Sequence, residues 1–130
     1  MKILRLLLVV TVLAFMCTNC RYSFLVPEEG SGIDPGDPDA PEISFAEEIE
    51  PIFESKCVSC HTTGEQRPDL STGNAFSSIN SSRYINDAAP TESLIYKYPH
   101  PDTGTHQQKK YSSADADLIL AWIIQGAKNN

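Results

Sequence analysis

The chain has 130 residues, a length that suits one domain with flanking segments. Its formal net charge is −7, and this acidity argues against nucleic acid as a partner, because phosphate backbones are bound by clustered Lys and Arg. Four cysteines are present, and their arrangement does not suggest a structural disulfide framework.

Residues 1–19 have the features of an export signal. Lys2 and Arg5 make the start of the chain positive, and residues 6–16 are apolar except for Thr11. This apolar segment is too short to span a bilayer core, which requires about 20 residues. We therefore predict a signal peptide instead of a transmembrane helix.

Two cysteines close the apolar segment, and a cysteine in this place resembles a bacterial lipoprotein signal. In that pattern the cysteine becomes the first residue of the mature chain and carries lipid. We predict Cys20 as the lipidated residue because Thr18 is acceptable two positions before it. Lipid on Cys17 would require cleavage beside the bulky Phe15 and Met16. The alternative is an ordinary cleaved signal with incidental cysteines.

A lipid anchor would place the protein in the bacterial cell envelope, facing the periplasm or attached to the outer membrane. Residues 20–42 are then predicted to form a disordered tether between the anchor and a domain over residues 43–130. The segment is rich in Pro, Gly, Asp and Glu and has too little apolar side chain to offset the entropy of ordering it.

A helix is predicted from Ser44 to the cysteine at position 57. Ser44 followed by Glu47 forms a capping box, in which a hydroxyl and a carboxylate each accept a backbone N–H. Pro51 lacks an N–H and is expected to kink the helix or restart it. Four apolar residues recur at helical spacing and define one buried face: Phe45, Ile49, Ile52 and Phe53.

The run CVSCH at residues 57–61 follows this helix directly and is the attachment pattern for a c-type haem. Two thiols at this spacing bond covalently to the two vinyl groups of one porphyrin, and the adjacent histidine reaches the iron as proximal ligand. The spacing is strict because both sulfurs and the imidazole must meet a rigid, planar partner. The motif predicts one covalently attached haem c, held by Cys57, Cys60 and His61.

Residues 62–90 are rich in Thr, Gly, Ser, Asn and Asp, which favour turns and short helices. The backbone C=O of Pro68 is a candidate acceptor for the free ring N–H of His61, and the alternative is a loop proline without this contact. Short helices are expected over residues 74–79 and 90–98. Their predicted apolar positions are Phe76, Ile79, Leu94, Ile95 and Tyr98.

A second long helix is predicted near the C-terminus. Ser112 with Asp115 forms its capping box, and Gly126 is expected to end it. Residues 118–124 are apolar without a break and include Trp122, which indicates burial on more than one side. We expect this helix to pack on the first helix with one face and on the porphyrin with another.

Together these elements resemble the small single-haem cytochrome c fold of class I type. The segments EIEPIFESKCVSCH, PDLSTGNAF and LILAWIIQGAKNN resemble in particular cytochrome c-like lipoproteins of environmental bacteria, over residues 43–130. The resemblance implies a mostly α fold wrapped around one covalent haem and a non-enzymatic electron carrier that acts with a redox protein partner. The acidic first helix would suit a basic partner, unless it is simply a solvated face.

Cytochromes of this fold usually place a methionine opposite the histidine, but both methionines of this chain, Met1 and Met16, lie in the signal. His106 lies a few residues before the final helix, where the family has its methionine, so His106 is predicted as the sixth ligand and His100 as the second choice. Bis-histidine ligation predicts a low-potential, low-spin haem suited to passing one electron. If neither histidine binds, the five-coordinate iron would suggest a haem enzyme or a gas sensor.

Two other classes compete with the haem hypothesis. Cys57, Cys60, His100 and His106 supply the ligand types of a Cys2His2 zinc module, although this leaves His61 unexplained. A disulfide oxidoreductase would use the C-x-x-C pair, but that chemistry expects a βαβ pattern, whereas this sequence predicts helices and turns.

Overall fold

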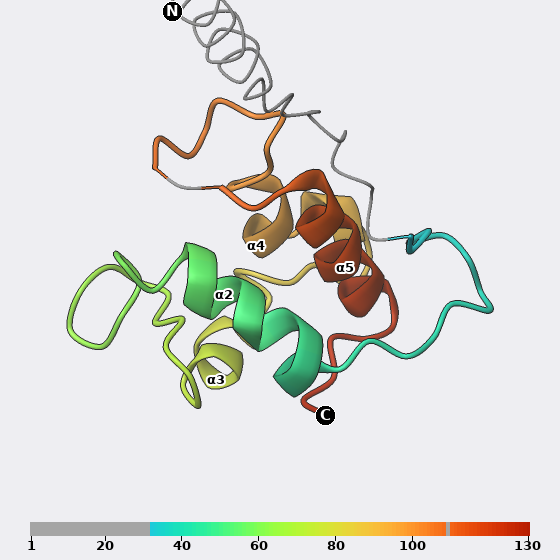
Figure 1. Ribbon diagram of the computed structural model, residues 1–130, viewed down its shortest axis with the longest axis horizontal. Helices are drawn as coiled ribbons and strands as arrows, with labels where there is room; N and C mark the ends of the chain where they lie inside the picture. Colours follow the sequence, from blue (N-terminus) through green and yellow to red (C-terminus); the bar gives the residue numbers. More distant parts are fainter. Residues whose placement is uncertain (1–31, 109) are drawn as a thin grey trace, which may run out of the picture.

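The computed structural model describes residues 32–108 and 110–130. The predicted signal over residues 1–19, the predicted lipidation site Cys20 and the first part of the predicted tether lie outside them. Within the described ranges all regular structure is helical, which confirms the expected mostly α fold (Figure 1). No helix in these ranges is both long and apolar enough to cross a membrane.

The first helix forms in two pieces because Pro51 cannot continue the backbone hydrogen-bond ladder. A turn of π-helix, η2 (Phe45–Ile49), comes first, and the α-helix α2 (Glu50–Lys56) restarts with the proline in its first turn. Figure 1 shows the two as a continuous green helix that leads towards the C-x-x-C-H run. Of the two outcomes expected for Pro51, the structure has the restart.

Ser44 caps this helix as predicted, but a different carboxylate completes the cap. The Ser44 hydroxyl accepts from the N–H of Glu47 at 3.2 Å, whereas the Ser44 N–H donates to Oε2 of Glu48 at 2.7 Å. The π turn is wider than an α turn, and the N–H of Ile49 donates back to the Ser44 carbonyl at 3.3 Å. The capping-box prediction is therefore right for Ser44 and wrong for Glu47.

One hydrophobic core joins the two ends of the domain. The four apolar residues predicted for the first helix are all buried, with exposed fractions between 0% and 7%. The ring of Phe45 lies 5.4 Å from that of Trp122 and 5.3 Å from that of Phe76, between centroids. These aromatic contacts pack the first helix against the last helix and the middle of the chain.

Three short helices form the middle of the chain, namely α3 (Ala75–Ile79), η3 (Pro90–Glu92) and α4 (Leu94–Lys97). Of the predicted apolar positions, Ile79 and Ile95 are buried, and Phe76 is half-buried against the core. Leu94 and Tyr98 are instead 39% and 46% exposed. Both residues line the cavity described below.

The last helix, α5 (Ser113–Ile124), begins and ends as predicted. The Ser112 N–H donates to the carboxylate of Asp115 at 2.9 Å, and the Asp115 N–H donates to the Ser112 hydroxyl at 3.2 Å. Gly126 ends the helix with a φ of +97°, a conformation that an L side chain rarely adopts.

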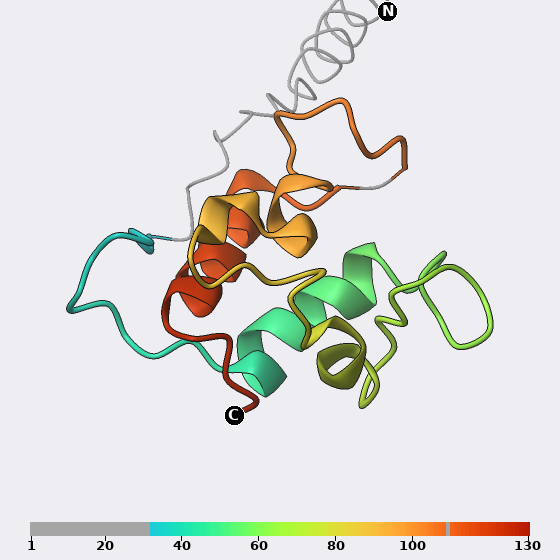
Figure 2. The ribbon, with the colours of Figure 1, turned by 180° about the vertical axis from the view of Figure 1, so that it is seen from behind.

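The second apolar face of α5 covers η3 and α4, while its first face packs on η2 (Figures 1 and 2). The described residues that line the cavity include none from α5. Neighbouring helices thus cover both apolar faces of α5, and its packing on a porphyrin stays a prediction.

The described part of the predicted tether contacts the end of the domain. Ile33 packs against the core, the Pro41 carbonyl accepts from the amide of Gln125 at 2.9 Å, and Glu42 forms an ion pair with Lys128 at 2.9 Å. In the structure, residues 32–42 therefore fold against the domain. They lie on the opposite side of α5 from the loops that follow α2 and α4 (Figure 2).

Candidate functional site

A cavity of about 630 Å³ opens between the loop that follows α2 and the loop that follows α4. This volume falls within the range of cofactor pockets, roughly 300–1,000 Å³. Four predicted site residues line it: Cys57, Cys60, His61 and His106. The structure thus brings His106 to the same cavity as Cys57, although more than half of the predicted domain separates them in the sequence.

A single turn at the end of α2 presents the two thiols and the first imidazole. The N–H of Cys57, the C-cap of α2, donates to the Phe53 carbonyl at 2.8 Å, and the N–H groups of Cys60 and His61 both donate to the Cys57 carbonyl at 3.1 and 3.0 Å. The two cysteines are half-buried and not joined in a disulfide. The turn therefore explains how all three side chains reach one cavity.

Burial raises the pKa of the Cys57 thiol to about 11; the nearby Asp115 carboxylate adds to the rise, and the Lys56 ammonium opposes it. The thiol is consequently protonated at neutral pH. Disulfide oxidoreductases instead lower the pKa of their attacking cysteine to generate a thiolate. This electrostatic environment argues against the oxidoreductase alternative.

The ring of His61 is held by the carbonyl of Pro68, as predicted. The distance from Nδ1 to the Pro68 oxygen is 3.1 Å, and Pro68 is itself buried. A bond from Nδ1–H to a carbonyl leaves Nε2 free to bind a metal, and it orients the ring and raises its basicity. The main chain of the same loop also returns to His61, because the Leu70 N–H donates to the His61 carbonyl at 2.8 Å.

Asp69 braces the Pro68 loop, a role that the sequence analysis missed. Its carboxylate accepts from the hydroxyl and N–H of Ser71 and from the Thr63 hydroxyl at 2.8 Å, and these bonds hold its pKa below the ordinary value of 3.8. Its N–H donates to the Ser78 hydroxyl at 2.8 Å. An Asp followed two residues later by Ser is a turn signal from which this brace was predictable.

The rings of His61 and His106 lie close together in the lining of the cavity, and their centroid spacing suits one shared metal ion. Their centroids are 6.2 Å apart and their planes differ by 32°. Two imidazole–metal bonds of about 2 Å and two ring radii of about 1.1 Å would place the centroids roughly 6 Å apart for in-line ligation. The structure therefore has the two rings close to the separation that bis-histidine ligation requires.

The surroundings of His106 differ from those of His61. Its Nδ1 is buried and has no hydrogen-bond partner among the described residues. The ring of Tyr98 meets that of His106 nearly edge-on, with centroids 5.5 Å apart and an interplanar angle of 82°. A buried ring nitrogen without a partner is costly, so a ligand that satisfies the imidazole would stabilise this arrangement.

His100, the second choice for the sixth ligand, is not among the described residues that line the cavity. Its ring packs against Tyr96, with centroids 5.1 Å apart, and its Nδ1 accepts from the N–H of Asp102 at 3.2 Å. The geometry therefore favours His106. It also disfavours the zinc alternative, which needs both histidines beside the two cysteines.

Over residues 32–108 and 110–130, no three Cys, His, Asp or Glu side chains lie close enough together to hold a metal ion. The Cys2His2 set is accordingly not assembled. A haem needs at most two protein ligands on its iron, so its requirements differ from those of a zinc site.

Apolar and cationic side chains supply the remaining walls. The apolar and aromatic lining comprises Phe53, Pro68, Leu70, Tyr84, Leu94, Ile95, Tyr98, Pro99 and Tyr111. Lys56, Arg67 and Arg83 add positive charge, and none of the described lining residues is Asp or Glu. The cavity lining is therefore positive although the whole chain has a net charge of −7. Such a lining favours a ligand that is largely apolar and carries negative groups.

Tyr111 forms one wall of the cavity and ties the loop to α4. It is only 2% exposed, and its hydroxyl donates to the Ile95 carbonyl at 3.1 Å and to the Tyr96 carbonyl. These carbonyls lie at the end of α4, where the helix itself supplies no donors. Burial raises the pKa of Tyr111 above its ordinary value, so the hydroxyl remains a donor.

Comparison with protein-family models, with curated proteins and with solved structures finds no match to this chain. The class of the protein is therefore described from its own fold and site. It is a small helical protein in which two thiols and two imidazoles line a single, partly cationic cavity.

Proposed function

We propose that this protein is a lipid-anchored c-type cytochrome that passes single electrons through one covalently attached haem. The observation that carries the proposal is the convergence of Cys57, Cys60, His61 and His106 on one cavity, with the two rings 6.2 Å apart. When bound, the haem supplies the one-electron redox chemistry. The residues of the chain supply attachment, orientation and the electrostatic environment.

Each side chain of the site has a distinct role in this proposal. Cys57 and Cys60 would hold the haem through thioether bonds. His61, oriented by the Pro68 carbonyl, and His106 would bind its iron. Two imidazole ligands would give a lower potential than a histidine and a methionine, which suits electron transfer better than substrate conversion.

The walls of the cavity suit the two parts of a haem. Apolar side chains such as Leu94 and Tyr98, which are exposed to the cavity, would pack on the ring. Lys56, Arg67 and Arg83 would neutralise the two carboxylates of the porphyrin, whose burial would otherwise be costly.

The proposed partner is a redox protein with a basic surface. Glu47 and Glu54 of the first helix are exposed and present negative charge to solvent. Exposed charges of this kind mainly accelerate the encounter with the partner protein, and this effect weakens as salt screens the charges. The proposed anchor at Cys20 would keep the domain in the cell envelope beside such a partner.

The proposal is tested by producing the full chain, with its signal, in a bacterium that attaches c-type haem in its periplasm. The pyridine haemochrome spectrum of the purified protein is expected to show one haem per chain, and metal analysis is expected to show iron. Absence of haem together with stoichiometric zinc would overturn the proposal. A high-spin ferric spectrum would instead favour the five-coordinate enzyme or sensor.

A further inference from the structure

We propose that Lys110 is a positioning residue, whose ammonium group, with help from the Thr105 hydroxyl, braces the loop of residues 98–108 so that His106 meets the metal. The inference rests on the proposed function and extends it by naming what holds the sixth ligand in place. Nothing in the sequence pattern singles out this lysine.

The need for a brace follows from the difference between the two imidazoles. His61 is oriented by its own Nδ1 contact with the Pro68 carbonyl, at 3.1 Å. The Nδ1 of His106 has no such contact within the described residues, and its ring has the rings of Tyr98 and His61 as neighbours. The position of His106 must therefore come from the backbone that carries it.

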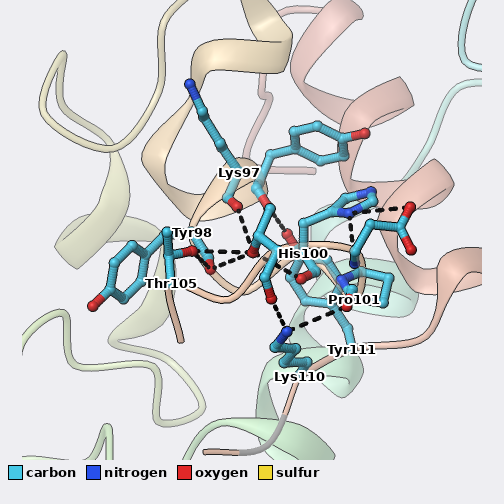
Figure 3. Close-up of polar contacts among 10 residues, drawn as sticks. Lys97, Tyr98, His100, Pro101, Thr105, Lys110 and Tyr111 are labelled. Carbon is cyan, nitrogen blue, oxygen red and sulfur yellow. Dashed lines mark hydrogen bonds and ion pairs between the residues drawn. The ribbon is translucent and has the colours of Figure 1, made fainter. Parts of the chain in front are cut away.

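The loop that carries His106 is fixed on both sides of this residue. Nζ of Lys110 donates to the carbonyl of Pro101 at 3.2 Å and to the carbonyl of Thr103 (Figure 3). The Thr105 hydroxyl donates to the Tyr98 carbonyl at 2.6 Å. Thr105 precedes His106 and Lys110 follows it in the sequence, and both residues contact the earlier part of the loop.

An ammonium group is well suited to this role. It carries three donors and can hold two carbonyls at once, through charge-assisted bonds that are stronger than those between neutral groups. Lys110 is half-buried and forms none of the ion pairs found among the described residues. Lys97 offers a contrast, because it pairs with Glu92 on the surface, where such a bridge contributes little.

This contrast supplies a matched control. In Lys110→Met the ammonium is lost and the length of the side chain is nearly kept, and Lys97→Met makes the same change outside the brace. The readouts are the fraction of low-spin ferric haem and the affinity of the haem-loaded protein for added imidazole, which competes with His106. The affinity of Lys110→Met for imidazole is expected to rise about tenfold, corresponding to the loss of about one charge-assisted hydrogen bond. Lys97→Met is expected to match the wild type, and Lys110→Arg is expected to lie between.

Wild-type imidazole affinity in Lys110→Met would overturn the inference while leaving the proposed function intact. A wild-type protein without covalent haem, or with a high-spin ferric spectrum, would instead overturn the proposed function. If Lys110→Met does not fold, Thr105→Val removes the bonds of this hydroxyl to the Tyr98 carbonyl and to the Thr103 hydroxyl, and it is expected to change the affinity in the same direction. An unchanged affinity in that variant would equally contradict the brace.

Discussion

Replacing each of the two loop histidines with alanine tests the ligand role that is proposed for His106 and not for His100. His106→Ala removes the imidazole whose ring centroid lies 6.2 Å from that of His61. His100→Ala removes an imidazole that packs on Tyr96 outside the cavity lining. We expect His106→Ala to convert the ferric haem from low spin to high spin, and His100→Ala to leave it low spin.

The size of the effect follows from how well His106 is placed in advance. The ring spacing is already close to the roughly 6 Å of in-line ligation, so binding requires little rearrangement. If His106 ligates the iron in about 99 of 100 molecules, an added ligand meets an open site in only about 1% of them. Removing His106 should then raise the apparent affinity for added imidazole about 100-fold.

Optical titration of the ferric protein with imidazole measures both the spin state and the affinity. The two variants are compared with the wild type at equal haem loading, so that differences in maturation do not enter. A low-spin His106→Ala variant with wild-type affinity for imidazole would refute the assignment. A high-spin His100→Ala variant would show that the ligand loop is arranged differently around the haem.

Two further variants test the walls of the site through the stability of the haem-loaded protein. Tyr111→Phe deprives the Ile95 and Tyr96 carbonyls of their donor and should lower the free energy of unfolding in urea by about 1–3 kcal/mol. Tyr98→Phe removes a hydroxyl with no partner among the described residues, and an equal loss in that control would contradict the reasoning. The bonds from Ser71 and Thr63 lower the pKa of Asp69 in the folded state, so its carboxylate stabilises the fold above pH 3.8, and this contribution is lost as the pH falls below that value. Asp69→Asn should therefore lower the melting temperature at neutral pH and converge with the wild type in acid, and a constant difference across this range would contradict the role of the carboxylate.

Local sequence signals predicted the helical parts of the domain well. Ser112 with Asp115, and Gly126 with its positive φ, mark the two ends of α5 because capping involves only residues next to one another. The same reasoning failed at Glu47, because the missing N–H of Pro51 accompanies a wider first turn that brings Glu48 to the cap instead. A missing donor at one residue thus changed the partner of another.

The apolar pattern did not distinguish the core from the cavity wall. Leu94 and Tyr98 have the spacing of core residues, yet they are exposed and line the cavity. A residue that packs on a ligand and one that packs on another helix show the same hydrophobicity. The two faces of α5 posed the same problem, since the sequence could not tell whether a helix or a porphyrin covers each face.

Predicted ligands that are close together in the sequence were easier to identify than a ligand that is distant from them. Residues 57–61 form one turn, so their spacing alone places the two thiols and His61 together. His106 was ranked above His100 only from its position before the last helix, and the loop geometry now supports that ranking. Lys110 and Tyr111 donate to main-chain carbonyls. Because every residue has a main-chain carbonyl, the sequence does not show which residues accept such bonds.

The central claim, covalent haem attachment through residues 57–61, is tested most directly by the intact mass of the periplasmically matured protein under denaturing conditions. The mass is expected to exceed that of the processed, lipidated chain by one haem. A variant with both Cys57→Ala and Cys60→Ala is expected to lose this increment, because only thioether bonds survive denaturation. A wild-type mass without the haem increment, obtained from cells that mature a known c-type cytochrome in parallel, would contradict the account.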